Sequence, residues 1–225
     1  MSAPSSTDGH VGTDADTGEL LAMGSATLYE ASGLACDLDP AFRPAWTGAR
    51  LAGTALPVQA AVGDNLPLHW ALEAARPGDV LVVDAGAAPF GYWGEVLAVA
   101  AQRRGVVGLI IDGGVRDTER MRALRFPAFS THVAIRGTVK EWPGTVGSLI
   151  LLRGRPVGRG DLVVADEDGI VVIPADQAGR VVEAARQRTA KEDAYMRRLR
   201  DGELTLDIYG FRGLGHPPGH ERAGE

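Results

Sequence analysis

Two continuous apolar runs, each closed by glycine, constrain the fold of this chain more than any other feature. DVLVVDAG (79–86) is followed by a glycine-rich stretch, by the alanine-rich segment GEVLAVAAQRRG (94–105), and then by the second run, VVGLIID (106–112). Short apolar runs of this kind predict buried strands. The segment between them has helical composition and ends at a glycine, where a C-cap is expected. The sequence therefore predicts an α/β core in which a helix connects two strands.

The other apolar patterns place further elements around this core. GELLAMGSATLYEAS (18–32) and NLPLHWALEAA (65–75) have helical spacing, and a long amphipathic helix is expected at about 175–200. GSLILLRGRPVGRGDLVVADEDGIVVIPAD (147–176) contains three β-rich runs separated by turns, which predicts a β-meander. No strict βαβ alternation links these segments. We therefore expect a three-layer, swivelling-domain-like β/β/α core with a barrel-like sheet and outer helices, not a dinucleotide-binding sheet.

Composition predicts one domain flanked by two tails. Residues 1–19 are rich in Ser, Thr, Asp and Gly and have almost nothing to bury, so we expect a disordered tail there and a flexible tail at 213–225. A single domain, including the C-terminal helix, is expected over 20–212. His216 and His220 lie four residues apart, but the prolines between them prevent a helix, so this pair is a weak metal-site candidate.

Charge, cysteine content and hydropathy argue against several classes of protein. The net charge of −6 gives no basic footprint for nucleic acid or anionic membranes. No apolar run approaches the ~20 residues that span a bilayer, and the N-terminus lacks a signal-peptide pattern. The single Cys36 can form neither an internal disulfide nor a thiolate metal cluster. We expect a cytoplasmic protein with no nucleic-acid or membrane partner.

The candidate chemistry lies where the two predicted strands end. A helix starting near Gly94 and Glu95 presents free backbone N–H groups, which suit a carboxylate or phosphate. After the second strand, in DGGVRD, Arg116 can fork two donors onto a carboxylate and Asp117 can bind a hard cation. Twenty residues, about one helix and one strand, separate Glu95 from Arg116. We therefore expect these side chains to converge on one small anion and one metal, with glycines 113 and 114 letting the backbone approach.

A structural interpretation of the same residues stays open. A glutamate in the first turn is favoured by the helix macrodipole alone, so Glu95 needs no catalytic role. Arg116 and Asp117 can equally form a solvated pair at the start of the next helix, TERMRAL. No G-x-G-x-x-G after a strand, Walker motif or nucleophile elbow is present, so the signatures of a dehydrogenase, a kinase and a hydrolase are missing.

Five stretches together carry a family resemblance: PGDVLVVDAG, WGEVLAVAAQRRGVVGLIIDGGVRD, FPAF, RGTVKEWPG and GDLVVADEDGIVVIP. Over about 24–212 the chain resembles the family that joins the regulator of ribonuclease E activity A (RraA) to the class II 4-hydroxy-4-methyl-2-oxoglutarate / 4-carboxy-4-hydroxy-2-oxoadipate aldolases. The family signature is an acidic residue, twenty residues and then Arg-Asp, here Glu95, Arg116 and Asp117. RRLRDGELTLDIYGFR (197–212) resembles the C-terminal segment of the aldolase branch.

The resemblance implies a metal-dependent carbon–carbon lyase that cleaves a 4-hydroxy-2-oxo acid through a pyruvate enolate, with decarboxylation of oxaloacetate as an activity to be tested. It implies that Asp117 binds Mg²⁺ or Mn²⁺, largely through waters, and that Arg116 holds the 2-oxo acid and stabilises the enolate oxygen. Glu95 is expected to contact the metal's water shell and help move protons. The substrate carboxylate is expected on the backbone N–H groups of Gly94, Glu95, Val96 and Leu97.

The resemblance also implies a homotrimer or homohexamer with sites at subunit interfaces. Glu192 of a neighbouring C-terminal helix is the candidate to reach the metal's waters, although a solvated helix-face charge is the alternative. Glu192 or Glu203 is expected near a neighbour's site. Two other functions stay open: a non-catalytic RraA-like protein that binds and inhibits a ribonuclease or another partner, and an enzyme of this fold acting on another 2-oxo acid or a biosynthetic intermediate. Asp117 favours an enzyme, because the best-known members of the inhibitor branch lack the metal-binding aspartate.

Five further residues are candidates for the same site. His132 and Arg136 in FSTHVAIRG lie where substrate selection is expected, or are simply hydrogen-bonded in the fold. Asp64, Asn65 and His69 in GDNLPLHWAL can line the same cleft, with a helix N-cap as the simpler role for Asp64 or Asn65.

Overall fold

The computed structural model describes residues 15–215. The C-terminal histidine pair and most of both expected tails therefore lie outside the described residues. The last three residues of the expected N-terminal tail, Thr17 to Glu19, are helical. The reason is a cap that the composition did not reveal, in which the Asp16 side chain accepts a hydrogen bond from Glu19 N at 2.8 Å.

The elements follow one another as α1 (Thr17–Ser32), β1 (Arg43–Pro44), β2 (Leu51–Gln59), α2 (Leu66–Ala74), β3 (Asp79–Trp93), α3 (Glu95–Arg103), β4 (Gly108–Val115), α4 (Thr118–Ala123), β5 (Ala128–Val133), β6 (Thr145–Val146), β7 (Ile150–Leu152), β8 (Arg155–Val157), β9 (Leu162–Ala165), β10 (Ile170–Ile173), α5 (Ala178–Arg200), α6 (Thr205–Ile208) and the 3₁₀ helix η1 (Phe211–Leu214). No helix among them is long and apolar enough to span a membrane.

The central sheet is built on four parallel strands. Its order is β1-β5-β4-β3-β2-β9-β10, with β6 also paired to β2, and β2 to β5 run parallel to one another. They are joined by α2, α3 and α4, so the expectation that βαβ alternation is lacking was wrong. The pattern was hidden because β2 carries Gly53 and Pro57, which interrupt its apolar run. Within the parallel set β2 to β5, consecutive strands are neighbours, so this set lacks the switch point of a dinucleotide-binding fold.

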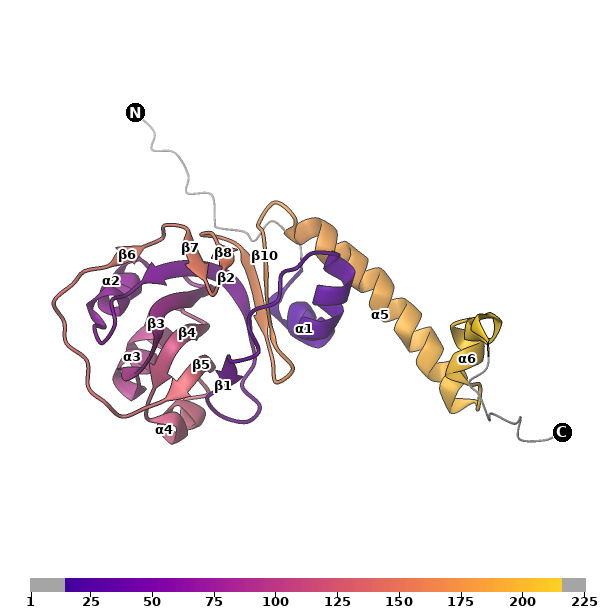
Figure 1. Cartoon of the computed structure of the whole chain (residues 1–225), viewed down its shortest axis with the longest axis horizontal. Helices are drawn as coiled ribbons and strands as arrows, with labels where there is room; N and C mark the ends of the chain where they lie inside the picture. Colours follow the sequence, from indigo (N-terminus) through magenta and orange to yellow (C-terminus); the bar gives the residue numbers. More distant parts are fainter. Residues whose placement is uncertain (1–14, 216–225) are drawn as a thin grey trace, which may run out of the picture. The chain divides into compact units, whose positions relative to one another are not determined.

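The sheet separates two hydrophobic clusters and so produces the expected layers. One face packs on α2 and α3 through residues such as Leu81, Val83 and Ile111. The other face, with Val82 and Ile110, packs on the separate β7–β8 hairpin. Figure 1 shows the strands curling into an open half-barrel with α2, α3 and α4 along its outer side. The predicted α/β class with a barrel-like sheet and outer helices is confirmed, but the expected meander is two separate hairpins, β7–β8 and β9–β10.

Strand β3 is longer than the sequence predicts. The glycine-rich stretch after DVLVV, expected as a loop, continues the strand to Trp93 with three register shifts against β4. These irregularities explain the glycines of β4. A Cβ at Gly114 would lie 2.4 Å from Phe90 O, and one at Gly113 would lie 3.1 Å from Ala85 Cβ. The two glycines therefore let β3 and β4 pack together, and the expectation that they open the backbone to a ligand was wrong.

The described chain divides into two compact units, with the boundary between Ala185 and Arg186. In the first unit, α1 and the start of α5 share a third hydrophobic cluster with β9 and β10. In the second unit, Tyr209 packs edge-on against Tyr195 and stacks on Phe211, with ring centroids 5.2 and 5.4 Å apart. The single domain expected over 20–212 stays a prediction.

Candidate active site

The ends of β3 and β4 bring the predicted site residues together. Trp93 pairs with Val115, and Arg116 N donates a hydrogen bond to Trp93 O at 2.8 Å. Helix α3 begins at Glu95, one residue after the end of β3, and α4 begins directly after Asp117. The start of α3 therefore faces the Arg116-Asp117 pair, as the spacing of twenty residues predicts.

Asp117 is fastened to the start of α3. Its Oδ2 accepts a hydrogen bond from Glu95 N at 3.1 Å and lies 3.8 Å from Arg116 Nε. The backbone of Asp117 is left-handed, with φ 55° and ψ 37°, a conformation that aspartate tolerates better than most residues. A Cβ at position 94 would lie 2.4 Å from Asp117 Oδ2 and 3.1 Å from Arg116 Cγ. Gly94 is therefore the glycine that makes room for the pair.

A cavity of about 190 Å³ opens over these residues. Its lining residues are Asn65, His69, Gly91, Tyr92, Trp93, Gly94, Val96, Leu97, Arg116, Asp117 and Lys140. The Arg116 and Asp117 side chains are 48% and 41% exposed, so both are accessible to a ligand. Asp117 carries the one carboxylate among the described residues that line this cavity.

The first turn of α3 supplies backbone donors to the cavity. Ala98 N is the first amide to bond back along the helix, to Gly94 O at 3.0 Å. The N–H groups of Val96 and Leu97 therefore have no partner inside the helix, and both residues line the cavity. Glu95 differs from the expectation, because its N–H is taken by Asp117 and its side chain does not line the cavity.

Lys140, His69 and Asn65 complete the cavity wall. Sequence reasoning weighed His69 and Asn65 for this cleft, and the structure brings both to it; it missed Lys140, which no motif in the sequence singled out. Asn65 occupies the N-cap position of α2 without making a side-chain cap. Its Nδ2 instead donates to Tyr92 O at 2.9 Å, and its buried Oδ1 finds no partner among the described residues. Asp64 is the residue that caps α2, accepting from Leu66 N at 2.9 Å.

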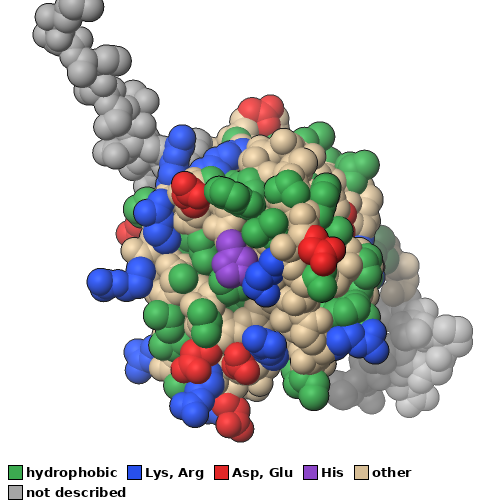
Figure 2. All heavy atoms as spheres, turned by 90° about the vertical axis from the view of Figure 1, so that its left-hand side faces the viewer, with side chains coloured by type: hydrophobic (Ala, Val, Ile, Leu, Met, Phe, Trp, Pro, Cys, Tyr) green, Lys and Arg blue, Asp and Glu red, His purple; other side chains and the backbone are tan. Residues whose placement is uncertain are grey.

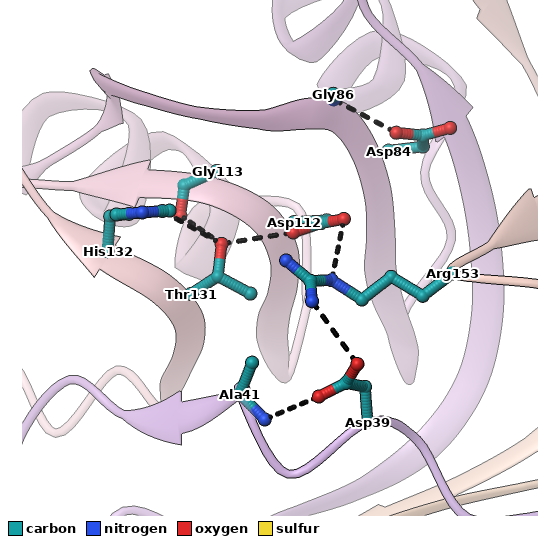
Figure 3. A network of polar contacts seen from close by, with 9 residues as sticks. All are labelled: Asp39, Ala41, Asp84, Gly86, Asp112, Gly113, Thr131, His132 and Arg153. Carbon is teal, nitrogen blue, oxygen red and sulfur yellow. Dashed lines mark hydrogen bonds and ion pairs between the residues drawn. The ribbon is translucent and has the colours of Figure 1, made fainter.

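His132 and Arg136 lie outside the cavity lining. The guanidinium of Arg136 stacks over the ring of Phe90, 5.0 Å from its centroid. His132 Nδ1 lies 3.1 Å from Thr131 Oγ1, which donates to Asp112 Oδ1 at 3.0 Å. This contact belongs to a polar network in which Arg153 reaches between Asp112 and Asp39 (Figure 3). Both residues therefore have structural partners in the described chain.

Glu192 and Glu203 belong to the second unit and have cationic partners there. Glu192 Oε1 lies 2.8 Å from Arg188 Nε, four residues earlier on α5. Glu203 accepts from the guanidinium of Arg198, which holds the pKa of this exposed carboxyl below its ordinary value. Glu192 is a charge on the surface of α5, and Glu203 lies between the end of α5 and the start of α6. Their expected contact with a neighbouring subunit's site stays a prediction.

The donor set fits a hard divalent cation held mainly by water and substrate. No three His, Cys, Asp or Glu side chains in the described part of the chain lie close enough to hold a metal on their own. A protein cage for zinc is therefore not formed by these residues. Magnesium differs, because it keeps several waters and typically binds through one or two carboxylates and substrate oxygens. The half-exposed Asp117 carboxylate in the cavity fits that pattern.

Lys140 shapes the electrostatics of this pocket. Burial, followed by the charge of Lys140, lowers the pKa of His69 below its ordinary value of 6.5. The imidazole of His69 is therefore neutral near pH 7. Burial raises the pKa of Asp64, but three backbone N–H donors and the charge of Lys140 outweigh this effect and hold it below its ordinary value. Lys140 lines the same cavity as His69 of α2, which is the proximity that both effects require.

We expect an NMR titration of His69 to give a pKa below 6.5, and the Lys140→Met variant to move it upward while burial keeps it below that value. Since the folded pKa is lowered, the unfolded chain binds the proton first, and this group costs stability as pH falls below 6.5. Arg136→Met serves as a matched control, because Arg136 does not line the cavity. An unchanged His69 pKa in Lys140→Met would contradict the inferred proximity.

Comparisons with known proteins match this architecture. Residues 25–172 match the model of the family described as "RraA-like: Aldolase/RraA". A protein of Halalkalibacterium halodurans named "Putative 4-hydroxy-4-methyl-2-oxoglutarate aldolase" is 33% identical over 174 residues, which cover 77% of this chain and 83% of that protein.

Two solved structures are similar in fold. The Streptomyces coelicolor protein RraAS2, described as an unusual member of the RNase ES inhibitor RraA protein family, is 31% identical with a TM-score of 0.69, over 80% of this chain and 96% of that one. An uncharacterized protein from Pseudomonas syringae is 24% identical with a TM-score of 0.73, over 85% and 95% of the two chains, a similarity that concerns the fold alone.

Proposed function

This chain belongs to the RraA-like Aldolase/RraA family, and on that premise we propose that it is a divalent-metal-dependent lyase that cleaves a 4-hydroxy-2-oxo acid. The observation that carries the proposal is the meeting of Arg116, Asp117 and the free amides of α3 in one small cavity. A cation, a metal-binding carboxylate and a carboxylate-binding helix start are the groups that a 2-oxo acid requires.

The cleavage that we propose is a retro-aldol reaction. The 4-hydroxyl of the substrate loses its proton, the bond between C3 and C4 breaks, and its electron pair moves through C3 and C2 onto the 2-oxo oxygen. C4 leaves as a carbonyl carbon, and the pyruvate enolate then takes a proton at C3. The barrier depends on the negative charge that gathers on the enolate oxygen, so donors fixed around that oxygen accelerate the reaction.

Each part of this reaction is assigned to particular residues of the chain. The N–H groups of Val96 and Leu97 are free to hold the substrate carboxylate at the helix start. The guanidinium of Arg116 is the donor that we assign to the enolate oxygen. Asp117 is the residue that we assign to Mg²⁺ or Mn²⁺, which when bound would supply a Lewis acid for the 2-oxo group. Proton movement by Glu95 through water is part of the proposal, although its side chain does not line the cavity of the single chain.

We further propose that the chain assembles as a homotrimer or homohexamer. Exposed hydrophobic side chains support this, namely Trp70, Val96, Val133, Ile135, Val139 and Trp142, which are 42–89% exposed. Figure 2 shows hydrophobic side chains spread between charged ones over one face of the molecule. A neighbouring subunit is also the proposed source of Glu192 or Glu203 at the metal's waters. A solution mass corresponding only to a monomer at micromolar concentration would contradict this assembly.

The test of the activity is a panel of substrates with and without metal. The full chain is assayed for pyruvate release from 4-hydroxy-4-methyl-2-oxoglutarate, 4-carboxy-4-hydroxy-2-oxoadipate and oxaloacetate, with Mg²⁺, Mn²⁺ or a chelator. We expect turnover with either metal and none with the chelator. No turnover on any of these substrates, or turnover that a chelator leaves unchanged, would contradict the proposal.

The alternative is a binding protein of the inhibitor branch, which the similarity to RraAS2 supports. It predicts metal-independent binding of a ribonuclease and no pyruvate release. Another 2-oxo acid as substrate would instead give metal-dependent turnover outside the named panel. Extending the assay to further 2-oxo acids, with metal or a chelator, therefore separates an enzyme with a different substrate from a binding protein without activity.

A further inference from the structure

We propose that Asp64 is a positioning residue of the site, which acts by holding the backbone on the C-terminal side of Lys140 against the start of α2. Asp64 does not line the cavity and is 3% exposed, so it meets no substrate. The inference deepens the proposed function and rests on it only for the kinetic part of its test.

One carboxylate joins two distant segments. Asp64 Oδ2 accepts hydrogen bonds from Glu141 N at 2.8 Å and Trp142 N at 2.7 Å, across 77 and 78 residues of sequence. Oδ1 accepts from Leu66 N at 2.9 Å, in the first turn of α2. A helix cap requires only the last of these bonds. The two bonds from the distant segment show that Asp64 also fastens the 134–144 connection to α2.

The backbone on the other side of Lys140 is fixed as well. Val139 N donates to Gly63 O at 2.9 Å, and Asn65 N donates to Val139 O at 3.1 Å. Asp64 and Val139 form a parallel β-bridge. Lys140 therefore lies between Val139, which is bridged to Asp64, and Glu141, whose N–H group donates to the Asp64 carboxylate. A long side chain loses less freedom when it reaches its place from a backbone that is already held.

The three hydrogen bonds that Asp64 accepts from Leu66, Glu141 and Trp142 are here called the clamp. The clamp acts at the cavity through Lys140. Lys140 lines the cavity with Asn65, which follows Asp64 directly, and with His69 of α2. The clamp thus fixes the backbone at Lys140 relative to the start of α2. The negative charge of Asp64 matters too, because three N–H donors converge on its carboxylate, which can only accept hydrogen bonds. An asparagine has one acceptor oxygen and would present N–H against N–H at one position or more.

The clamp itself is tested by amide exchange. We expect the Glu141 and Trp142 amides to exchange at least about tenfold faster in Asp64→Ala than in the wild-type chain, with Asp64→Asn between them. The matched control is Asp166→Ala, because Asp166 also accepts from several backbone amides, including those of Ser25 and Asp168, and lies outside the cavity lining. Unchanged exchange at 141 and 142 in a folded Asp64→Ala chain would overturn the proposal.

A double-mutant cycle with Lys140→Met tests the positioning role. We expect Asp64→Asn and Lys140→Met each to raise KM about tenfold, and the double variant to be little worse than the weaker-binding single variant, since Asp64 acts through Lys140. Asp166→Ala combined with Lys140→Met should instead show additive changes. Additive effects of Asp64→Asn and Lys140→Met would reduce Asp64 to a structural residue and overturn the proposal.

The proposed lyase function and this inference fail separately. If the wild-type chain releases no pyruvate from any substrate, the function falls. The same cycle is then measured as the Kd of oxalate, a small dicarboxylate probe, by calorimetry with Mg²⁺ present. Coupled losses of oxalate affinity would support the role of Asp64 at the cavity, whereas additive losses, or equal affinity in all four proteins, would overturn it.

Discussion

Asp117→Asn is expected to abolish metal-dependent pyruvate release while leaving the fold intact. Asp117 carries the one carboxylate among the described cavity-lining residues, so no other side chain there replaces it as a ligand for Mg²⁺ or Mn²⁺. Loss of one contact that stabilises the developing charge typically costs about 3–4 kcal/mol, or a factor of hundreds in rate. The measurement is lyase activity at saturating metal, beside a thermal melt.

The choice of asparagine separates chemistry from folding. Asp117 has a left-handed backbone and accepts a hydrogen bond from Glu95 N. Asparagine tolerates that backbone and keeps an acceptor oxygen, whereas Asp117→Ala loses both advantages and should also melt lower. Glu119→Gln is the matched control, because it removes a carboxylate two residues further along, outside the cavity lining. Near-normal turnover in folded Asp117→Asn would end the aldolase interpretation and leave the pair as a surface feature.

The core of the site could be predicted because its geometry is local. One helix and one strand separate Glu95 from Arg116, and parallel neighbouring strands end at the same edge of a sheet. Spacing alone therefore placed Arg116 and Asp117 beside the start of α3. It could not place the Glu95 side chain, because the direction of a carboxylate in a first helical turn depends on local rotamers and neighbours, which spacing does not determine.

The rest of the cavity could not be predicted because it depends on contacts between distant segments. Lys140 reaches the site only because the connection after β5 pairs with the turn before α2. Nothing near Lys140 in the sequence reports that pairing. The role of the glycines of β4 could not be predicted for the same reason, because it depends on how closely β3 approaches them. Strand β2 was missed for a different reason, since its glycine and proline weaken the local strand signal.

Arg116→Lys is the second change expected to remove most of the activity. The Arg116 side chain passes over Gly91 and Gly94, where a Cβ at either position would lie 3.1 Å from its methylene carbons. This packing and the Asp117 carboxylate, 3.8 Å from Nε, orient the planar guanidinium at the cavity. A lysine ammonium is a point charge and cannot place two parallel N–H donors on a 2-oxo acid.

We expect Arg116→Lys to lower kcat/KM by about a hundredfold or more, with most of the loss in kcat, because the donor matters more for the enolate than for the substrate. Arg120→Lys is the matched control, since Arg120 is an exposed arginine of α4 that lies outside the cavity lining. The assay is pyruvate release at saturating Mg²⁺ over a range of substrate concentrations. A rise in KM alone, with kcat unchanged, would show that Arg116 only binds the substrate, and its assignment to the enolate oxygen would then be wrong.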